Sequence, residues 1–377
     1  MSNLRFTLRE VQNTSSFSYF QLTYIVMIKI DGSIGEGGGQ VLRVCLALSA
    51  LTGESVAIKN VRVNRANPGL RSQHLTAMRA LAEVANAKVS GLGLGSSEIT
   101  FVPGRRGGGI YSFDAKTAGS TTLILQALLP VLAFADQPSS VTLIGGTNNP
   151  LAPQVDYVIN VLNPVLASMG FFYQLRVGRR GFYPRGGGVL KVAITPVERL
   201  TAINVVSMGS LRGIRGISHS RNLPAHVAER QAEAATQSCT SAGYPNVSIE
   251  RDSDQREQSP STGSGIVLWA VTSTGGRLAG DALGARGKPA EVVGQEGAAK
   301  LLMQLSKGAP FDVHLGDQLV IWLALAEGRC RIATSELTLH TVTAVEVTEM
   351  VTGCQFKVSG EVGSPGVIDC TGCITPR

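Results

Sequence analysis

The stretch DGSIGEGGGQVLRVCLALSALTG, residues 31–53, indicates both a fold and a site. An apolar segment at 28–30 precedes it and an apolar run follows, so glycines occupy the junction between an expected strand and an expected helix. Glycines let backbone N–H groups approach a ligand, and a helix N-terminus favours an anion. Glu36 could hold a divalent metal and Arg43 could bind a phosphate. A metal–nucleotide site and a simple tight turn therefore both fit this stretch.

Strand and helix patterns recur in a fixed order between residues 27 and 200. The first unit predicts strands at 28–30, 56–63, 88–90 and 99–102, and helices at 41–51 and 71–85. The second predicts strands at 109–113, 140–144, 172–177 and 188–195, and helices at 121–134 and 154–169. Both units follow the order β-α-β-α-β-β, which indicates an internal repeat of roughly eighty residues.

The pattern changes near residue 202 and returns to the repeat after residue 304. We expect a smaller inserted α/β domain at 204–304, with helices at 224–241 and 290–305, strands at 247–250 and 266–272, and a polar loop at 252–265. A third, split copy of the repeat follows, with helices at 315–325 and 340–352 and strands at 330–333 and 355–358. The predicted class is α/β (α+β), with one large domain formed by 27–203 plus 305–360. Residues 1–26 are expected to be a poorly ordered extension, and 361–377 a C-terminal tail without regular structure.

The charge of the chain permits a polyanionic partner such as RNA, and a solvated basic face explains it equally well. The formal net charge is +7 over 377 residues, and aromatic residues make up only 5%, so the composition does not predict a base-stacking platform. Several arginines lie near glycines, a setting that suits phosphate recognition: Arg105, Arg106, Arg176, Arg179, Arg180 and Arg185.

The six cysteines predict no metal centre. Cys45 lies in an apolar helical run and is expected in the core. Cys370 and Cys373 form a C-x-x-C without a second pair at zinc spacing, so a free tail is favoured over the alternative of a redox or metal role. No signal peptide is evident, and the apolar run at 123–135 is too short to span a bilayer. A reducing intracellular compartment and no membrane partner are expected.

Histidine offers the clearest candidate for chemistry. The five histidines are His74, His219, His226, His314 and His340. His340 lies where a strand-like segment gives way to a helix, so it could be a nucleophile, a base or a helix-entry residue. The sequence contains no H-E-x-x-H, no G-x-S-x-G and no Walker A motif, and it lacks G-x-G-x-x-G at the first strand. The common nucleotide-binding folds are therefore disfavoured.

Seven segments occur in the order found in RNA 3′-terminal phosphate cyclases. They are DGSIGEGGGQVLR (31–43), NPGLRSQHL (67–75), AGSTTLILQALLP (118–130), GGTNNPLAPQVDY (145–157), GFYPRGGG (181–188), HLGDQL (314–319) and TLHTVTA (338–344). The chain resembles this family from residue 27 to about 358. The resemblance implies three repeated β-α-β-α-β-β units with an inserted α/β domain. It also implies an enzyme that converts an RNA 3′-phosphate to a 2′,3′-cyclic phosphate with ATP, through a histidine–AMP intermediate and an RNA adenylate.

The resemblance also assigns roles to residues. His340 matches the nucleophile, and Glu36 matches the residue that coordinates Mg²⁺ or Mn²⁺ beside the ATP phosphates. Other matched positions are implied to bind ATP or phosphates: Arg43, Arg62, Gln73, Gln126, Pro153, Asp317, Gln318 and His314, where relatives often have tyrosine. Taken alone, Asp317 and Gln318 would be a helix N-terminal pair, Gln126 a buried amide, and Arg62 and Gln73 surface residues.

Two other functions stay open at this point. Cyclase-like proteins of the same family act as binding factors in ribosome biogenesis and lack the nucleophile, so His340 favours the enzyme. Enolpyruvyl transferases are also built from repeated α/β units. The segment TLHTVTA looks closer to eukaryotic relatives. For a eukaryotic protein this resemblance implies a nuclear setting, and for any other protein it implies a cytoplasmic one. The physiological RNA and the oligomeric state are not determined by these patterns.

Overall fold

The fold consists mainly of four four-stranded sheets, three of which come from repeated units. The computed structural model describes residues 6–10, 20–24, 27–253 and 259–376. The first unit contains β3 (Met27–Asp31), α1 (Gly39–Thr52), β4 (Ser55–Lys59), α2 (Ser72–Val84), β5 (Lys88–Ser90) and β6 (Ile99–Val102). The second contains β7 (Ile110–Asp114), α3 (Thr121–Leu132), β8 (Ser139–Gly145), a second helical segment, β9 (Tyr173–Arg179) and β10 (Gly188–Ile194). The predicted α/β class is confirmed.

The second helical segment of this unit is not the single α-helix that the sequence predicts. It consists of α4 (Val155–Tyr157), the π-helix η1 (Val158–Leu162) and α5 (Asn163–Ser168). Pro164 lies at the start of α5 and has no N–H to donate, so the wider π turn before it falls where the regular hydrogen-bond pattern must change.

The third unit repeats the topology of the first two. It contains β12 (Asn204–Val205), α8 (Val313–Gln318), α9 (Val320–Leu325), β18 (Arg329–Thr334), α10 (Leu339–Thr352), β19 (Phe356–Ser359) and β20 (Gly366–Thr371). The three strand orders, β3-β4-β6-β5, β7-β8-β10-β9 and β12-β18-β20-β19, are equivalent. A two-residue parallel pair, β11 (Leu200–Thr201) and β17 (Ala326–Glu327), connects the second and third units.

The prediction of an irregular tail after residue 360 is wrong. Residues 366–371 form β20, which pairs with both β18 and β19 and supplies the sixth element of the third unit. Cys373 is bonded to Cys354, while Cys370 is a buried free cysteine opposite Cys330 in the sheet. The two cysteines of the C-x-x-C therefore have different environments: Cys373 forms a disulfide and Cys370 lies in the core. Sequence spacing alone could not show this.

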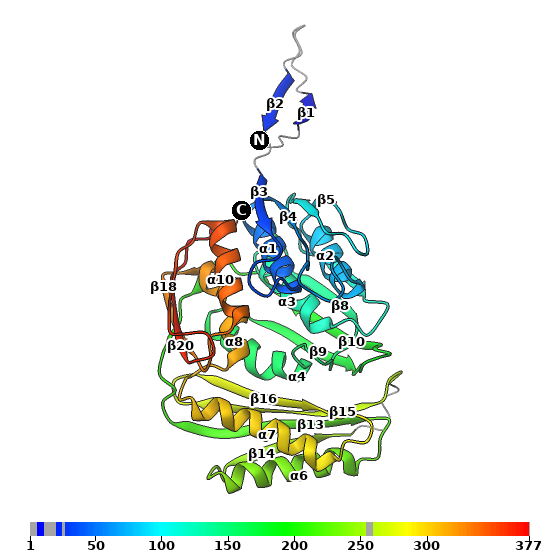
Figure 1. The fold of residues 1–377 in the computed structure, drawn as a ribbon, viewed down its shortest axis with the longest axis vertical. Helices are drawn as coiled ribbons and strands as arrows, with labels where there is room; N and C mark the ends of the chain where they lie inside the picture. The colour runs from blue at the N-terminus through cyan, green and yellow to red at the C-terminus, as the bar shows by residue number, and fades with distance from the viewer. Residues whose placement is uncertain (1–5, 11–19, 25–26, 254–258, 377) are drawn as a thin grey trace.

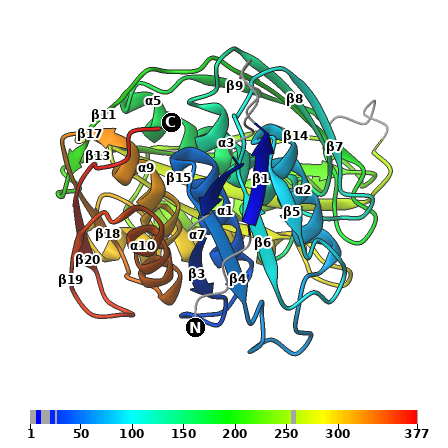
Figure 2. The ribbon, with the colours of Figure 1, turned by 90° about the horizontal axis from the view of Figure 1, so that it is seen from above.

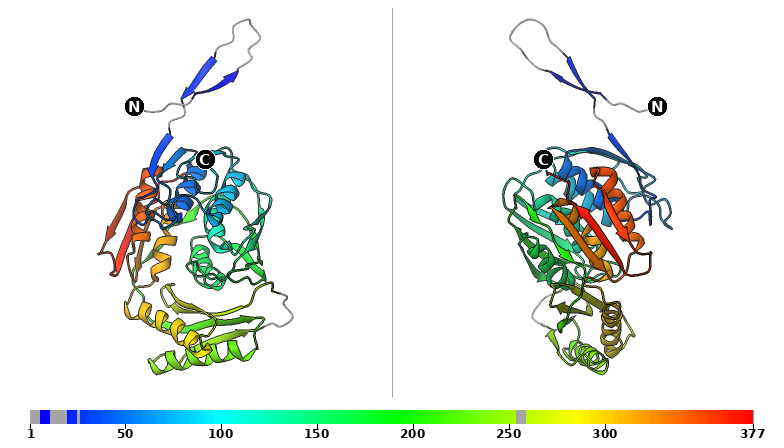
Figure 3. Two further views of the ribbon diagram at one scale, coloured as in Figure 1. Left: turned by 45° about the vertical axis from the view of Figure 1, so that its right-hand side comes forward. Right: turned by 90° about the vertical axis from the view of Figure 1, so that its left-hand side faces the viewer.

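A separate sheet lies between β12 and α8 in the sequence. It is formed by β13 (Leu211–Arg221), β14 (Val247–Asp252), β15 (Gly263–Thr272) and β16 (Arg277–Leu283), in the order β14-β13-β15-β16. The helices α6 (His226–Ser241) and α7 (Ala290–Ser306) pack against each other and against this sheet (Figures 1 and 3). The sequence missed β13 and β16, and the predicted polar loop is shortened because β14 and β15 extend into it.

Helices of the three units meet in the interior, and their sheets lie around them (Figure 2). Helix α1 packs against α2, α3 and α10, so the start of the chain contacts its end. Strands β1 (Phe6–Glu10) and β2 (Phe20–Tyr24) pair with each other and stand away from the rest (Figure 1). The expected poor order of residues 1–26 stays a prediction, and residues 1–5, 11–19 and 25–26 lie outside the described residues. No helix in the described part of the chain is long and apolar enough to cross a membrane.

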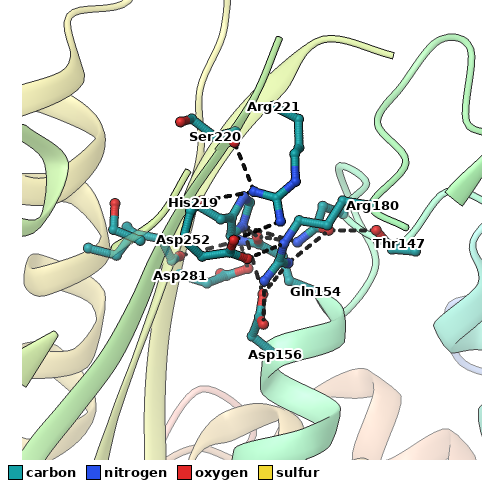
Figure 4. Close-up of polar contacts among 12 residues, drawn as sticks. Thr147, Gln154, Asp156, Arg180, His219, Ser220, Arg221, Asp252 and Asp281 are labelled. Atoms are coloured by element: carbon teal, nitrogen blue, oxygen red, sulfur yellow. Dashed lines mark hydrogen bonds and ion pairs between the residues drawn. The ribbon is translucent and has the colours of Figure 1, made fainter. Parts of the chain in front are cut away.

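A buried ion-pair cluster connects the second unit to the inserted sheet (Figure 4). Asp156 on α4 accepts two hydrogen bonds from Arg180, at 2.7 and 2.9 Å, and both side chains are almost fully buried. The Nε of Arg180 donates to Asp252 at 3.0 Å, and Asp252 also accepts a 2.7 Å hydrogen bond from Arg221. Arg180 therefore has a structural role, although the sequence marks it for phosphate recognition. The same holds for Arg106, which is buried and donates a hydrogen bond to the Phe134 carbonyl.

Candidate active site

His340 lies in the first turn of α10, where its imidazole can face an anion. Thr338 is the N-cap, and its hydroxyl accepts a 3.1 Å hydrogen bond from the Thr341 N–H. A threonine at this position satisfies one of the free donors that begin every helix. The His340 side chain is 46% exposed, so one edge of the ring remains open to a ligand.

Gln40, at the start of α1, determines which nitrogen of His340 is open. The His340 Nδ1 lies 2.6 Å from the Gln40 Oε1, and the Gln40 Nε2 donates to Asp317 and to the His340 carbonyl, each at 3.1 Å. An amide oxygen only accepts, so the contact with Gln40 favours the neutral tautomer that carries its proton on Nδ1, whereas the Glu36 carboxylate beside Nε2 favours a proton there. The sequence analysis did not select Gln40. A usable signal existed, since Gln40 and Arg43 are three residues apart on the same helix face.

Glu36 faces the open nitrogen of His340. Its Oε2 lies 3.2 Å from the His340 Nε2 and 3.0 Å from the Arg65 Nη2. The glycine-rich turn makes this approach possible. Gly35 has φ +57°, and a Cβ there would collide with the hydroxyl of Thr343 on α10. Residues 32–38 therefore form a tight turn before α1, and this turn also places the Glu36 carboxylate against His340, about three hundred positions later in the chain.

The partly buried position of His340 favours the neutral imidazole. Partial burial lowers the pKa of His340; Glu36 opposes that shift, and the positive charges of Arg43 and Arg65 add to it. A neutral ring keeps the Nε2 lone pair available to an electrophile at physiological pH.

A second, buried histidine lies among arginines beside this group. The His74 Nδ1 accepts a 3.2 Å hydrogen bond from the Arg71 N–H at the start of α2. Burial, followed by the charges of Arg62, Arg43 and Arg71, lowers its pKa to about 3, so His74 is neutral. A Cβ at Gly39 would lie 2.7 Å from the His74 ring, which shows how closely the glycine turn packs here.

The arginines around His74 make a site suited to an anion. Arg43, Gln73 and His74 line one small pocket with Ser120, which begins α3. Three more positive charges act on this region. Those of Arg62 and Arg71 lower the pKa of His74, and that of Arg65 lowers the pKa of His340. Sequence patterns assigned no role to Arg65, His74 or Ser120. Arg62 has φ +55° and donates to the carbonyls of Asn67 and Gly69, so its described contacts hold its own loop.

A neighbouring pocket on the other side of α1 collects four of the predicted nucleotide-site residues. It is lined by Gln40, Arg43, Val44, Gln126, Asp317, Gln318, Ile321 and Ala344. Burial raises the pKa of Asp317 to about 6, although the charges of His314 and Arg43 oppose that shift. Burial also lowers the pKa of Arg43 to about 10, and Asp317 opposes this. Four segments that are far apart in sequence, at 40–44, 126, 317–321 and 344, thus line one pocket.

His314 and Pro153 lie outside both pockets. His314 is exposed near the start of α8, and its ring meets the edge of Tyr157 at a centroid distance of 6.2 Å. The Tyr157 hydroxyl donates to Asp312 at 2.8 Å, and Asp312 caps α8 through the N–H groups of His314 and Leu315. The Pro153 carbonyl accepts a 2.7 Å hydrogen bond from the Thr122 hydroxyl, which joins the 145–154 loop to α3.

The carboxylates near His340 do not form a closed metal cage. Among the described residues, no group of three or more His, Cys, Asp or Glu side chains could hold a metal ion. Glu36 is partly exposed and is a single hard oxygen ligand. That arrangement fits Mg²⁺, which often takes one or two carboxylates and completes its shell with water and phosphate oxygens.

Comparisons with known proteins identify the family. The family model described as RNA 3′-terminal phosphate cyclase matches residues 34–358. The RNA 3′-terminal phosphate cyclase of Staphylothermus marinus is 48% identical over 91% of this chain and 97% of its own length. That of Methanopyrus kandleri is 45% identical over 91% of this chain and 98% of its own. This chain belongs to the RNA 3′-terminal phosphate cyclase family.

A solved structure gives a much weaker likeness. The enolpyruvyl transferase NikO from Streptomyces tendae is 12% identical with a TM-score of 0.24, covering 91% of this chain and 65% of that chain. This value is too low to support any statement about fold or function.

The bond between Gln40 and His340 leads to a testable prediction. Replacing Gln40 with methionine should slow reaction of the His340 Nε2 with an activated phosphate by about tenfold or more, because the ring loses its orienting acceptor. The check is the rate at which α-labelled ATP labels the protein. Gln231→Met is the matched control, since Gln231 is equally buried but belongs to α6. Equal rates for Gln40→Met and wild type would contradict the prediction.

Proposed function

We propose that this chain converts an RNA 3′-terminal phosphate to a 2′,3′-cyclic phosphodiester at the expense of ATP. The observation that carries the proposal is the half-exposed His340 imidazole in the first turn of α10, with Nδ1 held by Gln40 and Nε2 facing Glu36. Membership in the cyclase family and the printed names of the relatives support the same activity.

The proposed reaction has three steps. The His340 Nε2 attacks the α-phosphorus of ATP, forming a P–N bond while the bond to pyrophosphate breaks. An oxygen of the RNA 3′-phosphate then attacks that phosphorus, which breaks the P–N bond and yields an RNA adenylate. Finally the neighbouring 2′-OH attacks the RNA 3′-phosphorus, closing the ring and releasing AMP. The last step gains from proximity, because the nucleophile is already next to the activated phosphate.

The residues around His340 suit a path of this kind. Gln40 keeps the proton on Nδ1, so Nε2 can act as a nucleophile and later as a leaving group. Arg43 and Arg65 supply positive charge where negative charge develops on the transferring phosphate. The pocket lined by Gln126, Asp317 and Gln318 is assigned to the nucleotide, and the pocket of Gln73, His74 and Ser120 to a phosphate.

A divalent metal, Mg²⁺ or Mn²⁺, is part of the proposal. Glu36 would hold it beside the ATP phosphates, where it would neutralise charge on the departing pyrophosphate. In the structure Glu36 contacts the His340 Nε2, so the carboxylate must give up this contact before the nitrogen can attack.

Replacing Glu36 with glutamine should therefore slow labelling by α-labelled ATP, most strongly when the metal is limiting. The amide keeps the shape of the carboxylate but binds a hard cation poorly. The measurement is the labelling rate across a titration of Mg²⁺. Glu98→Gln, a change in an exposed carboxylate that pairs with Lys59, serves as the control. A metal titration that matches that of wild type would show that Glu36 is only structural.

The activity itself is tested with single-stranded RNA that ends in a 3′-phosphate. Incubation with ATP and metal should make the RNA end resistant to phosphatase, and omission of ATP should prevent this. A non-catalytic cyclase-like factor of ribosome biogenesis would give neither a labelled protein nor a resistant end, and would instead copurify with pre-ribosomal particles.

A further inference from the structure

The loop between β9 and β10 presents two side chains that the site described above does not use. Tyr183 is 68% exposed and Arg185 is also exposed, whereas the neighbouring Gly181, Phe182 and Gly186 are buried. We propose that Tyr183 and Arg185 bind the RNA strand upstream of its 3′-phosphate. Tyr183 stacks on a base and Arg185 contacts a backbone phosphate. This inference rests on the proposed function.

The backbone of this loop is fixed by hydrogen bonds with Ser261 and within the loop itself. The Phe182 N–H donates to the Ser261 hydroxyl at 2.8 Å, and that hydroxyl donates to the Gly186 carbonyl at 3.0 Å. The Gly186 N–H donates back to the Phe182 carbonyl at 2.7 Å, and the Arg179 Nε donates to the Gly187 carbonyl. Exposed side chains on a fixed support lose little additional backbone freedom when they bind, which favours a binding role over a simple turn.

The loop also lies next to the phosphate pocket. Gly186 packs so closely on the 117–118 turn that a Cβ there would lie 2.7 Å from the Ala118 Cα. A Cβ on the adjoining Gly119 would lie 3.7 Å from the Gln73 Cα, and Gln73 lines the pocket with Arg43 and His74. An RNA whose terminal phosphate occupies that pocket can therefore extend its preceding nucleotides over the 181–187 loop.

The chemistry of the pair fits single-stranded RNA. Unpaired bases stack on aromatic faces, and arginine binds phosphate through several donors. The neighbouring arginines are already engaged, since Arg179 holds the loop and Arg180 is buried with Asp156. Arg185, by contrast, has no hydrogen bond or ion pair to any residue that the structure describes. The overall composition could not reveal this surface, because the surface consists of only one aromatic residue and one arginine.

The experiment compares two substrates in the full-length protein: a single-stranded RNA oligonucleotide with a 3′-phosphate and a nucleoside 3′-monophosphate. Tyr183→Ala should raise KM for the oligonucleotide about tenfold, while KM for the monophosphate and the rate of labelling by α-labelled ATP stay unchanged. Tyr183→Phe should behave like wild type because it keeps the ring. Arg185→Ala should also raise the oligonucleotide KM and should weaken its dependence on salt.

Matched controls are available on strand β9 and beside it. Phe172 is 67% exposed and Arg176 is exposed, so Phe172→Ala and Arg176→Ala remove the same chemistry from another part of this sheet. Unchanged oligonucleotide KM values in both Tyr183→Ala and Arg185→Ala, or equal increases in the controls, would overturn the inference. A wild-type protein that neither becomes labelled nor cyclises RNA would instead refute the proposed function.

Discussion

Replacing His340 with alanine is expected to abolish covalent labelling of the protein by α-labelled ATP and, with it, cyclisation of RNA. In the proposed reaction the His340 Nε2 is the attacking nitrogen, because Nδ1 is occupied by Gln40. Alanine leaves no nucleophile at this position, so the residual rate should fall to the background of the assay. The measurement is acid-labile radioactivity retained on the denatured protein, followed by analysis of the RNA ends.

A second histidine provides the control for this experiment. His226 is exposed at the start of α6, in the inserted sheet and helices, so His226→Ala should label at the wild-type rate. His340→Ala should remain folded, because the side chain is 46% exposed and Thr338 still caps α10. Persistence of the acid-labile adduct in His340→Ala would refute the proposed nucleophile.

Replacing Arg180 with methionine is expected to lower the free energy of unfolding by about 3–5 kcal/mol. Methionine fills much of the same space, but the change leaves Asp156 as a buried carboxylate without its main cation. It also removes one of the two arginine partners of Asp252. The measurement is a urea unfolding curve, monitored by circular dichroism.

A surface pair that is also joined by two hydrogen bonds tests the role of burial. Arg230 binds Glu291 through two hydrogen bonds, at 2.6 and 2.8 Å, but both side chains are exposed. Arg230→Met should change the free energy of unfolding little, since water solvates both partners. An equal effect of the two substitutions would contradict the argument.

Acidification should reduce the effect of Arg180→Met. Burial alone would raise the pKa values of Asp156 and Asp252, but the arginine charges and hydrogen bonds lower both values below the ordinary range. Carboxylates whose folded-state pKa is lowered contribute stability above their unfolded pKa, and that contribution is lost as the pH falls through the folded-state value. The difference between wild type and variant should therefore shrink in acid.

Much of the fold could be predicted because each repeat carries its own local signals. Apolar periodicity and glycine turns marked most strands and helices of the first two units, and their common order predicted the repeat. The prediction failed at β20, β13 and β16, whose identity as strands depends on their sheet partners. The repeated order β-α-β-α-β-β itself implied a final strand in the third unit, so β20 was the most avoidable error.

The site was predictable only in part. Sequence segments marked Glu36, Arg43, Gln126, Asp317, Gln318 and His340, and the structure places these residues around the start of α1. Gln40 was missed because its role depends on a contact with His340, three hundred residues later. The sequence suggests phosphate recognition for Arg180 because it shows the charge of the side chain. It does not show that this side chain is buried and paired with Asp156.

The sequence by itself determined the repeated α/β organisation, the glycine turn that precedes α1 and the presence of a histidine at a helix start. These features follow from local preferences, since turn geometry, capping and apolar periodicity act over a few residues. Only the tertiary structure decided that Gln40 contacts His340, that Arg180 is buried, and that Tyr183 and Arg185 are exposed on a loop packed against the 117–118 turn. Those roles depend on which distant segments meet and on how much water remains between them, and packing fixes both.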